Sequence, residues 1–386
     1  MKVMRNTLLL FSLIIGVLCT ACRFGTQTEY IAVYGDGKKI PTGIYVMYEL
    51  SDALGSAMQK LREKDSTFYP HNLRSCFNCA IDGETMEELI EKIAKEKVTQ
   101  YVGIITLFDE LKLTLPTGKL EMLEQFAKIY DKKKMSLSEN GVGKESYIAC
   151  LEAKEKRAAI FDYYYGKDGK ERPTKEEIGR YFEEKFFKVQ TKIFYYGEQS
   201  AAQKAEVQKD AEAFRMRVTE EGFSKVLFSM EEESIKKEEK AKGTEPESGA
   251  NIDSALSGEA KKPEEKVKET EANEEKLKNI EAASIEVLNE KQVINYYAES
   301  GRDEIKKLLP GETTLLDVKH HNMLVVLQKL PMTEEECEKR EEEIIEEMKL
   351  EEFEKMLVEL GNRQGIKFDE EIVKKFKSSK LKFKER

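Results

Sequence analysis

The sequence predicts an α+β protein in which a long helical region leads into one small α/β unit. Thr174-x-x-Glu177 has the spacing of a capping box. In this motif the threonine side chain caps the first helical turn, and the glutamate side chain accepts a hydrogen bond from the backbone N–H of the threonine. From Phe187 to Tyr195 every second residue is apolar or β-branched, a pattern typical of a strand. The sequence before this helix and strand has apolar residues at helical spacing. The sequence after them can form one α/β unit with an insertion.

The composition limits the number of domains and the kinds of partner. The chain has 386 residues, enough for two or three domains. Charged residues make up 36% and hydrophobic residues 40%, so a core can be buried while part of the chain stays solvated. The net charge of -10 argues against nucleic acid as a partner, because binding phosphates requires a basic face. It also argues against general adhesion to anionic lipid.

The N-terminus has the pattern of an export signal. Two basic residues precede a short apolar run at residues 8–18, which is typical of a signal peptide rather than of a spanning helix. Residues 18–22 (LCTAC) resemble a lipobox, so we expect residues 1–21 to be removed and Cys22 to be lipidated. The lipid would hold the chain on the extracytoplasmic face of the cell membrane, with residues 22–29 as a tether. The alternative is a secreted protein without the lipid, cleaved at the same position.

Residues 30–172 are predicted to form a helical arm. A short strand at residues 30–34 opens it, and Thr85-x-x-Glu88 has the spacing of another capping box. The last helix of the arm is expected at residues 146–165. We interpret the apolar and aromatic stripe along these helices as core rather than as a ligand site.

Cys76 and Cys79 form a CxxC pair in a stretch without clear periodicity. One such pair with one nearby histidine lacks the four ligands of a structural zinc site, and no βαβ thioredoxin pattern surrounds it. We therefore interpret the pair as a local disulfide or as two thiols that hold a loop, with redox activity and metal binding as alternatives. We expect no bound metal and no cofactor. Cys150 and Cys337, in helical surroundings, are interpreted as packing residues or surface thiols.

Several of these segments resemble PrsA/SurA-type extracytoplasmic foldases, in which a helical arm leads into a parvulin-type prolyl isomerase domain. In that family a helix of the form S/T-x-E-E-x-x-x-Y-(Y/F) precedes a strand of the form V-x-H-I-L-(F/V). The helix is matched by Thr174, Glu176, Glu177, Tyr181 and Phe182, and the strand by residues 189–194 (VQTKIF). Residues 353–376 resemble the family's closing helix and strand, which pack on the arm.

The resemblance implies that a parvulin-like domain, residues 173–330, is inserted into a helical arm of the SurA N-terminal kind that residues 331–386 complete. The family's Gly-rich G-G-x-L-G loop is missing. In its place, residues 231–277 consist mainly of charged and small residues and contain no aromatic residue, so we expect this insertion to be disordered. The resemblance also requires residues 187–196 and 323–328 to lie side by side in one sheet.

The two catalytic histidines of parvulins have no counterpart in this sequence. Lys192 holds the first position, and by register Met323 holds the second, while a slip of one residue would place Asn322 there. His320 and His321 lie just upstream, as surface residues or as a shifted replacement. A lysine ammonium only donates hydrogen bonds and a methionine presents a soft apolar surface, so we expect isomerase activity to be weak or absent.

The resemblance therefore implies a membrane-anchored extracytoplasmic chaperone whose partners are unfolded or newly exported polypeptides, held in an apolar cleft between the arm and the parvulin-like unit. An active peptidyl-prolyl cis-trans isomerase with unusual site residues is the first alternative. A structural surface lipoprotein that keeps only the fold is the second. Assays on an X–Pro peptide and on the aggregation of an unfolded client separate the three.

Overall fold

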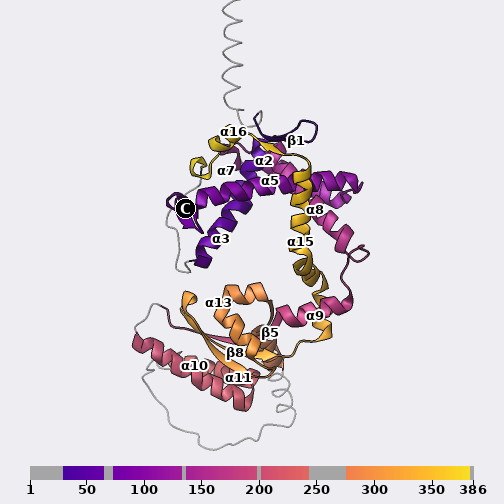
Figure 1. Cartoon of the computed structure of the whole chain (residues 1–386). Helices are drawn as coiled ribbons and strands as arrows, with labels where there is room; N and C mark the ends of the chain where they lie inside the picture. Colours follow the sequence, from indigo (N-terminus) through magenta and orange to yellow (C-terminus); the bar gives the residue numbers. More distant parts are fainter. Residues whose placement is uncertain (1–28, 65–72, 133–135, 198–200, 243–274, 383–386) are drawn as a thin grey trace, which may run out of the picture. The chain divides into compact units, whose positions relative to one another are not determined.

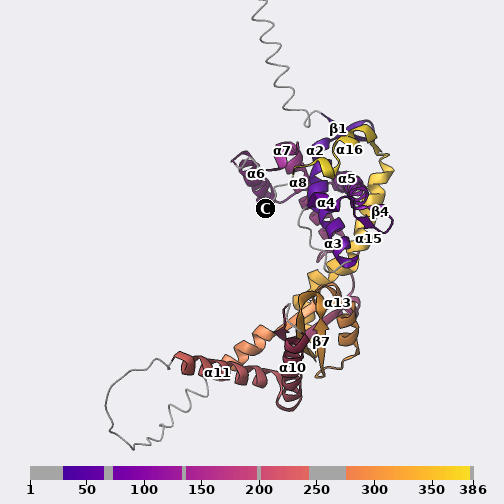
Figure 2. The same cartoon turned by 90° about the vertical axis from the view of Figure 1, so that its left-hand side faces the viewer.

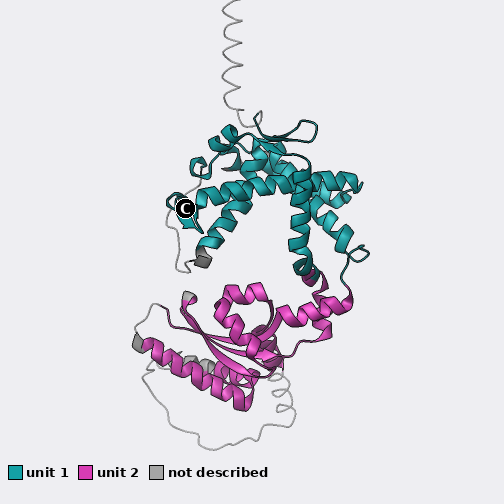
Figure 3. Ribbon diagram, in the orientation of Figure 1, with its two compact units in different colours: residues 1–173, 345–386 teal, residues 174–344 magenta. Residues whose placement is uncertain are grey.

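The computed structural model of the chain describes residues 29–64, 73–132, 136–197, 201–242 and 275–382. In these residues, helices and three small sheets form an α+β protein (Figure 1). The chain divides into two compact units (Figure 3). Unit 1 contains residues 1–173 and 345–386, and unit 2 contains residues 174–344. Unit 1 is therefore assembled from both ends of the chain.

Unit 1 is mainly helical. Its elements are β1 (Tyr30–Tyr34), β2 (Lys38–Pro41), α2 (Thr42–Tyr48), the π-helix η1 (Glu49–Ala53), α3 (Leu54–Lys64), α4 (Leu73–Cys76), β3 (Ala80–Ile81), β4 (Glu84–Thr85), α5 (Met86–Glu110), α6 (Thr117–Lys132), α7 (Ser136–Glu139), α8 (Lys144–Tyr165), α15 (Glu341–Arg363), β9 (Lys367–Phe368), α16 (Glu370–Lys375) and the 3-10 helix η3 (Ser378–Lys380). The first turn of α15 belongs to unit 2. Helix α5 contributes many buried side chains to the core, such as Ile90, Val98 and Val102.

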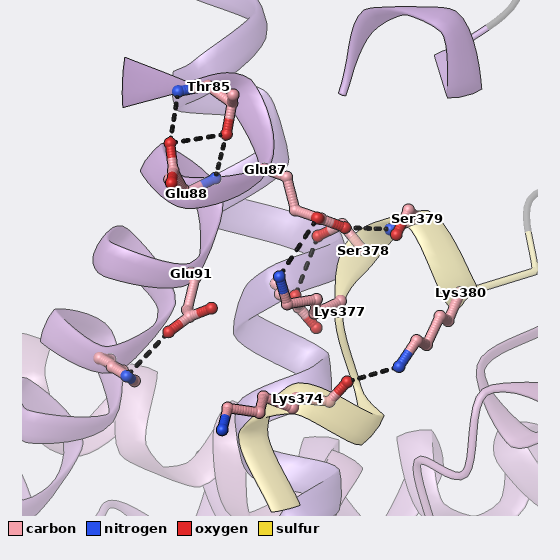
Figure 4. Close-up of polar contacts among 11 residues, drawn as sticks. Thr85, Glu87, Glu88, Glu91, Lys374, Lys377, Ser378, Ser379 and Lys380 are labelled. Carbon is pink, nitrogen blue, oxygen red and sulfur yellow. Dashed lines mark hydrogen bonds and ion pairs between the residues drawn. The ribbon is translucent and has the colours of Figure 1, made fainter. Parts of the chain in front are cut away.

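The C-terminal segment packs on the N-terminal part of unit 1. Strand β9 pairs antiparallel with β1, which places Phe368 opposite Ala32. The Glu87 carboxylate on α5 accepts hydrogen bonds from the Lys377 ammonium at 3.5 Å and from the Ser379 backbone N–H at 3.1 Å (Figure 4). These contacts join residues about three hundred positions apart in the sequence, and they hold the C-terminal segment on the rest of unit 1.

A buried carboxyl group anchors the same segment. The Ser378 hydroxyl donates a hydrogen bond of 2.9 Å to Glu49 in η1, whose side chain is almost fully buried. Burial raises the pKa of the Glu49 carboxyl to about 8, against the effect of the Ser378 hydrogen bond, because ionising a group away from water is costly.

Unit 2 contains a four-stranded antiparallel sheet. Its elements are α9 (Lys175–Lys185), β5 (Phe186–Tyr195), α10 (Ala201–Glu221), α11 (Phe223–Lys242), β6 (Ile285–Asn289), α13 (Glu290–Lys307), β7 (Thr313–Val318), the 3-10 helix η2 (Lys319–His321), β8 (Met323–Leu330) and α14 (Glu334–Lys339). The strand order is β6-β5-β8-β7. Helix α13 covers one face of the sheet, and α10 and α11 cover the other (Figure 1, Figure 2). The central pair, β5 and β8, confirms the expected neighbourhood of residues 187–196 and 323–328.

Both expected capping boxes are confirmed: Thr85 with Glu88 and Thr174 with Glu177 each exchange both hydrogen bonds at the start of a helix. Thr333 with Glu336 forms another one at the start of α14. The helix that begins after Thr333 is short, because the backbone of Arg340 leaves the helical conformation and separates α14 from α15. Helix α14 packs against α9. For that reason residues 331–344, assigned above to the arm, lie in unit 2.

The expected disorder of residues 231–277 needs correction at both ends. Helix α11 continues to Lys242, and residues 275–284 are also helical. Phe223, Val226 and Leu227 fix the first turns of α11 on the sheet, and the lysine and glutamate residues that follow are good helix formers. The remaining residues of the insertion, 243–274, lie outside the described part of the chain.

Candidate functional site

The alternation of side chains along β5 and β8 decides which predicted site residues meet. Residues directly opposite each other on paired strands share a face of the sheet. Lys192 lies opposite Val326, which packs with α10 and α11, whereas Met323 lies opposite Tyr195 and packs in the cluster formed with α13. The structure therefore places Lys192 and Met323 on opposite faces and does not bring them together in one site.

The turn between β7 and β8 carries the other candidates. His321 is exposed in η2, and the side chain of His320 lies outside the described part of the structure. Asn322 has a left-handed backbone, with φ 50° and ψ 47°, and its carbonyl oxygen accepts a hydrogen bond of 3.0 Å from the Tyr196 N–H. Asn322 thus serves to join the end of β5 to the turn. None of the three histidines of the chain, at positions 71, 320 and 321, lies on β5 or β8.

The α13 side of the sheet has an apolar surface that is partly uncovered. Ile193 and Tyr195 on β5 are 38% and 69% exposed, while their strand partners Val325 and Met323 are buried. We call Ile193 and Tyr195 the α13-face patch. Tyr296 on α13 is also exposed, with its ring centroid 6.1 Å from that of the buried Tyr297.

Tyr297 and Thr191 supply hydroxyl groups to this face. Burial and, to a smaller extent, the Glu286 carboxylate raise the pKa of Tyr297 to about 12. A hydrogen bond with Thr191 lowers this pKa but does not outweigh them. The phenol therefore stays protonated at neutral pH. Neither a phenol with this pKa nor a threonine hydroxyl exchanges protons readily near pH 7.

A backbone distortion lies next to Tyr297. Ala298 has φ 62° and ψ 176°, a conformation that only glycine adopts without strain, and it divides α13 at a kink. Gly301 lies at a position where an added Cβ atom would collide with the Cβ atom of Tyr297. The kink and the small residue allow Tyr297 to pack against the sheet.

A polar cluster on the opposite face was missed by the sequence analysis. The Asp317 carboxylate on β7 accepts hydrogen bonds from the Lys204 ammonium at 2.8 Å and from the Tyr196 hydroxyl at 3.0 Å. Burial raises the pKa of Asp317, but these two partners outweigh it and hold that pKa below its usual range. The cluster joins α10 to the edge of the sheet. Its residues are far apart in the sequence, so no local pattern could have indicated it.

The CxxC pair lies in unit 1, at the end of α4 and in the turn that follows. Both side chains are thiols: Cys76 is buried and Cys79 is partly buried. The segment consists of the short helix α4 and the turn that follows it. Within the described residues, no group of three or more His, Cys, Asp or Glu side chains is placed to hold a metal ion. Cys150 is buried and Cys337 is partly buried, both as thiols.

The predicted lipidation site, Cys22, lies outside the described residues, as does the whole apolar run that precedes it. In the part of the chain that the structure describes, no helix has the length and the hydrophobicity required to cross a lipid bilayer.

Fold and site together define an α+β protein with a helical unit made from both chain ends and a four-stranded antiparallel unit with an apolar sheet face. No protein-family model and no curated protein matches the chain. Among solved structures, it is similar to foldase protein PrsA from Streptococcus pneumoniae str. Canada MDR_19A, with 10% identity and a TM-score of 0.35 over 78% of this chain and 98% of that chain. It is also similar to foldase protein PrsA from Lactococcus lactis, with 10% identity and a TM-score of 0.32 over 91% of this chain and 100% of that chain.

Proposed function

We propose that this chain is a chaperone that holds unfolded polypeptides, and that its four-stranded unit binds them without catalysing prolyl isomerisation. The α13-face patch carries this proposal, because Ile193 and Tyr195 remain exposed beside the buried Val325 and Met323. A rigid sheet that presents apolar side chains favours the binding of an extended apolar segment, since contact removes apolar surface from water. The clients are newly exported polypeptides, in keeping with the signal-like N-terminus.

The first prediction tests the patch. The full-length chain should suppress the aggregation of a reduced, unfolded client, measured by light scattering. The double variant Ile193→Ser/Tyr195→Ser should need about tenfold more protein for the same effect, because two buried apolar contacts together are worth more than 1.4 kcal/mol. The variant Met216→Ser is the matched control, since Met216 is 63% exposed on α10 and lies away from this face.

The outcomes separate the chaperone from its alternatives. If the unaltered chain leaves aggregation unchanged, the protein is not a holdase, and a structural surface lipoprotein becomes the better interpretation. If Met216→Ser weakens suppression as much as the double variant does, client binding depends on exposed apolar area in general and not on the α13 face.

The second prediction concerns catalysis. In a peptide assay, the full-length chain should not accelerate isomerisation of an X–Pro bond, whose uncatalysed barrier is about 20 kcal/mol, because neither β5 nor β8 carries an imidazole. A measurable rate that is lost in Lys192→Ala or in His321→Ala would contradict this and would establish an active isomerase with unusual site residues.

We further propose that a lipid on Cys22 holds the chain on the extracytoplasmic face of the cell membrane, on the basis of the lipobox-like residues 18–22. In cell fractionation, the variant Cys22→Ala should move from the membrane fraction to the soluble exported fraction. If it stays in the membrane fraction, another anchor holds the chain.

A further inference from the structure

A pocket of about 330 Å³ lies in unit 2, where α9 faces α14 and the first turn of α15. Ile178 and Phe182 on α9 and Met332 before α14 supply its apolar lining. Ile178 and Phe182 are buried, and the Phe182 ring packs on that of Phe186 at 5.2 Å, so this lining is fixed in place. The lining shares no residue with the α13-face patch.

The rim of this pocket is strongly acidic. Four carboxylates and one ammonium line it: Glu183, Glu334, Glu338, Glu341 and Lys175. Lys175 lies 3.7 Å from Glu338, but both side chains are largely exposed, so this ion pair is weak. Among the described residues, Glu183 and Glu334 have no ion-pair partner. The rim therefore keeps a net negative charge that a cationic ligand can neutralise.

The thiol of Cys337, which lines the pocket, is affected by the negative charge of the rim. Burial raises the pKa of this thiol, and the carboxylates of Glu341, Glu334, Glu338 and Glu183 raise it further. The negative charges thus act on a residue of the lining itself, and not only on the outer edge of the rim.

We propose that this pocket binds a basic segment of an unfolded polypeptide, with one apolar side chain against Met332 and Cys337 and flanking lysines or arginines facing the acidic rim. This inference rests on the proposed chaperone function and names the clients it favours: chains in which apolar residues are flanked by basic ones. Charge complementarity selects this occupant over a second copy of the chain, whose own net charge is -10.

Fluorescence anisotropy of a labelled peptide tests the proposal with the full-length chain. The peptide KKLLKK should bind, and binding should weaken as salt is raised. EELLEE, with the opposite charge, and KKSSKK, without the apolar residues, should each bind at least tenfold more weakly. If KKLLKK and EELLEE bind equally well, the acidic rim plays no part and the proposal is wrong.

Two pairs of variants locate the binding. Gly179→Leu should abolish KKLLKK binding, because Gly179 lines the pocket, an added Cβ there meets no atom within 4 Å, and the larger side chain would occupy the space that the peptide needs. Gly55→Leu, at an equally open helical position in unit 1, should leave binding unchanged. Glu183→Gln should weaken binding about threefold, while Glu184→Gln, the next residue outside the lining, should not.

Alkylation of the thiols gives a readout that needs no variant. Bound KKLLKK should slow the reaction of Cys337 with a maleimide at least threefold, as measured by peptide mass spectrometry. Cys79, also partly buried but in unit 1, should react at an unchanged rate. If Cys337 is not protected while the peptide is bound, the peptide binds elsewhere and the pocket assignment is wrong.

The same experiments distinguish this inference from the proposed function. If the chain suppresses client aggregation but Gly179→Leu binds KKLLKK normally, the chaperone function stands and the pocket inference fails. If KKLLKK protects Cys337 but no client is kept soluble, the pocket is a peptide site and the chaperone function fails.

Discussion

Replacing Gly361 with alanine is expected to lower the free energy of unfolding of unit 1 by about 3 kcal/mol. Gly361 lies inside α15, two residues before its end. An added Cβ atom would overlap with the backbone carbonyl oxygen of Thr99 on α5. In the same way, a Cβ atom added to Gly103 on α5 would overlap with the backbone carbonyl oxygen of Leu357 on α15. The two helices therefore cross with their backbones in contact.

This contact leaves no side chain that could move aside. Backbone atoms in the middle of two helices are held by their own hydrogen bonds, so an alanine can be accommodated only if α15 moves away from α5. Urea unfolding, followed by amide hydrogen exchange in α5 and α15, measures the loss of stability. Gly118→Ala on α6 is the matched control, because its new Cβ meets no atom within 4 Å and should cost nothing. Equal effects at positions 361 and 118 would contradict the close crossing.

Replacing Glu354 with alanine is expected to cost unit 1 about 2 to 3 kcal/mol. The Glu354 carboxylate on α15 accepts a hydrogen bond of 2.6 Å from Nε of Arg157 on α8, and it lies 3.3 Å from the Lys97 ammonium on α5. Gln100 also donates to it. The charged side chains of Glu354, Lys97 and Arg157 are each about three-quarters buried. Removing the carboxylate therefore leaves two cations with little access to water.

A neighbouring ion pair on the same helix provides the control. Glu351 pairs with Lys355 one turn along, at 2.7 Å, with both side chains largely exposed. Glu351→Ala should change the free energy of unfolding by no more than about 0.5 kcal/mol, because water already solvates both charges. Similar losses for Glu354→Ala and Glu351→Ala would show that the three-helix contact adds nothing beyond a surface pair.

The Glu354 contact also makes a pH prediction. Burial raises the pKa of Glu354, but the charges of Lys97 and Arg157 and the hydrogen bond from Gln100 outweigh it, so the folded-state pKa lies below the ordinary value of 4.5. The stability from this contact is therefore complete above pH 4.5 and is lost as the pH falls through the folded-state pKa. Unit 1 should lose urea resistance below about pH 4.5. In Glu354→Gln this part of the acid sensitivity should be absent.

Local features of the fold could be predicted from the sequence because they depend on residues close together in the chain. A capping box joins residues three positions apart, so Thr85 and Thr174 were sufficient to place two helix starts. The strand from Phe186 to Tyr195 was identified from alternation alone. Helix α13 was not predicted, because its kink at Ala298 interrupts the helical period.

What the sequence by itself determined is the fold class and several of its elements: an α+β chain with a mainly helical first part, then a strand that begins a small sheet, and no histidine on its two central strands. Only the tertiary structure decided which residues meet. It placed Lys192 and Met323 on opposite faces, Gly361 in a helix crossing, and the α9–α14 pocket beside a ring of carboxylates. The physical reason is that strand register and helix crossing depend on contacts between distant residues. A shift of one residue in register reverses the face of every side chain without changing the local pattern.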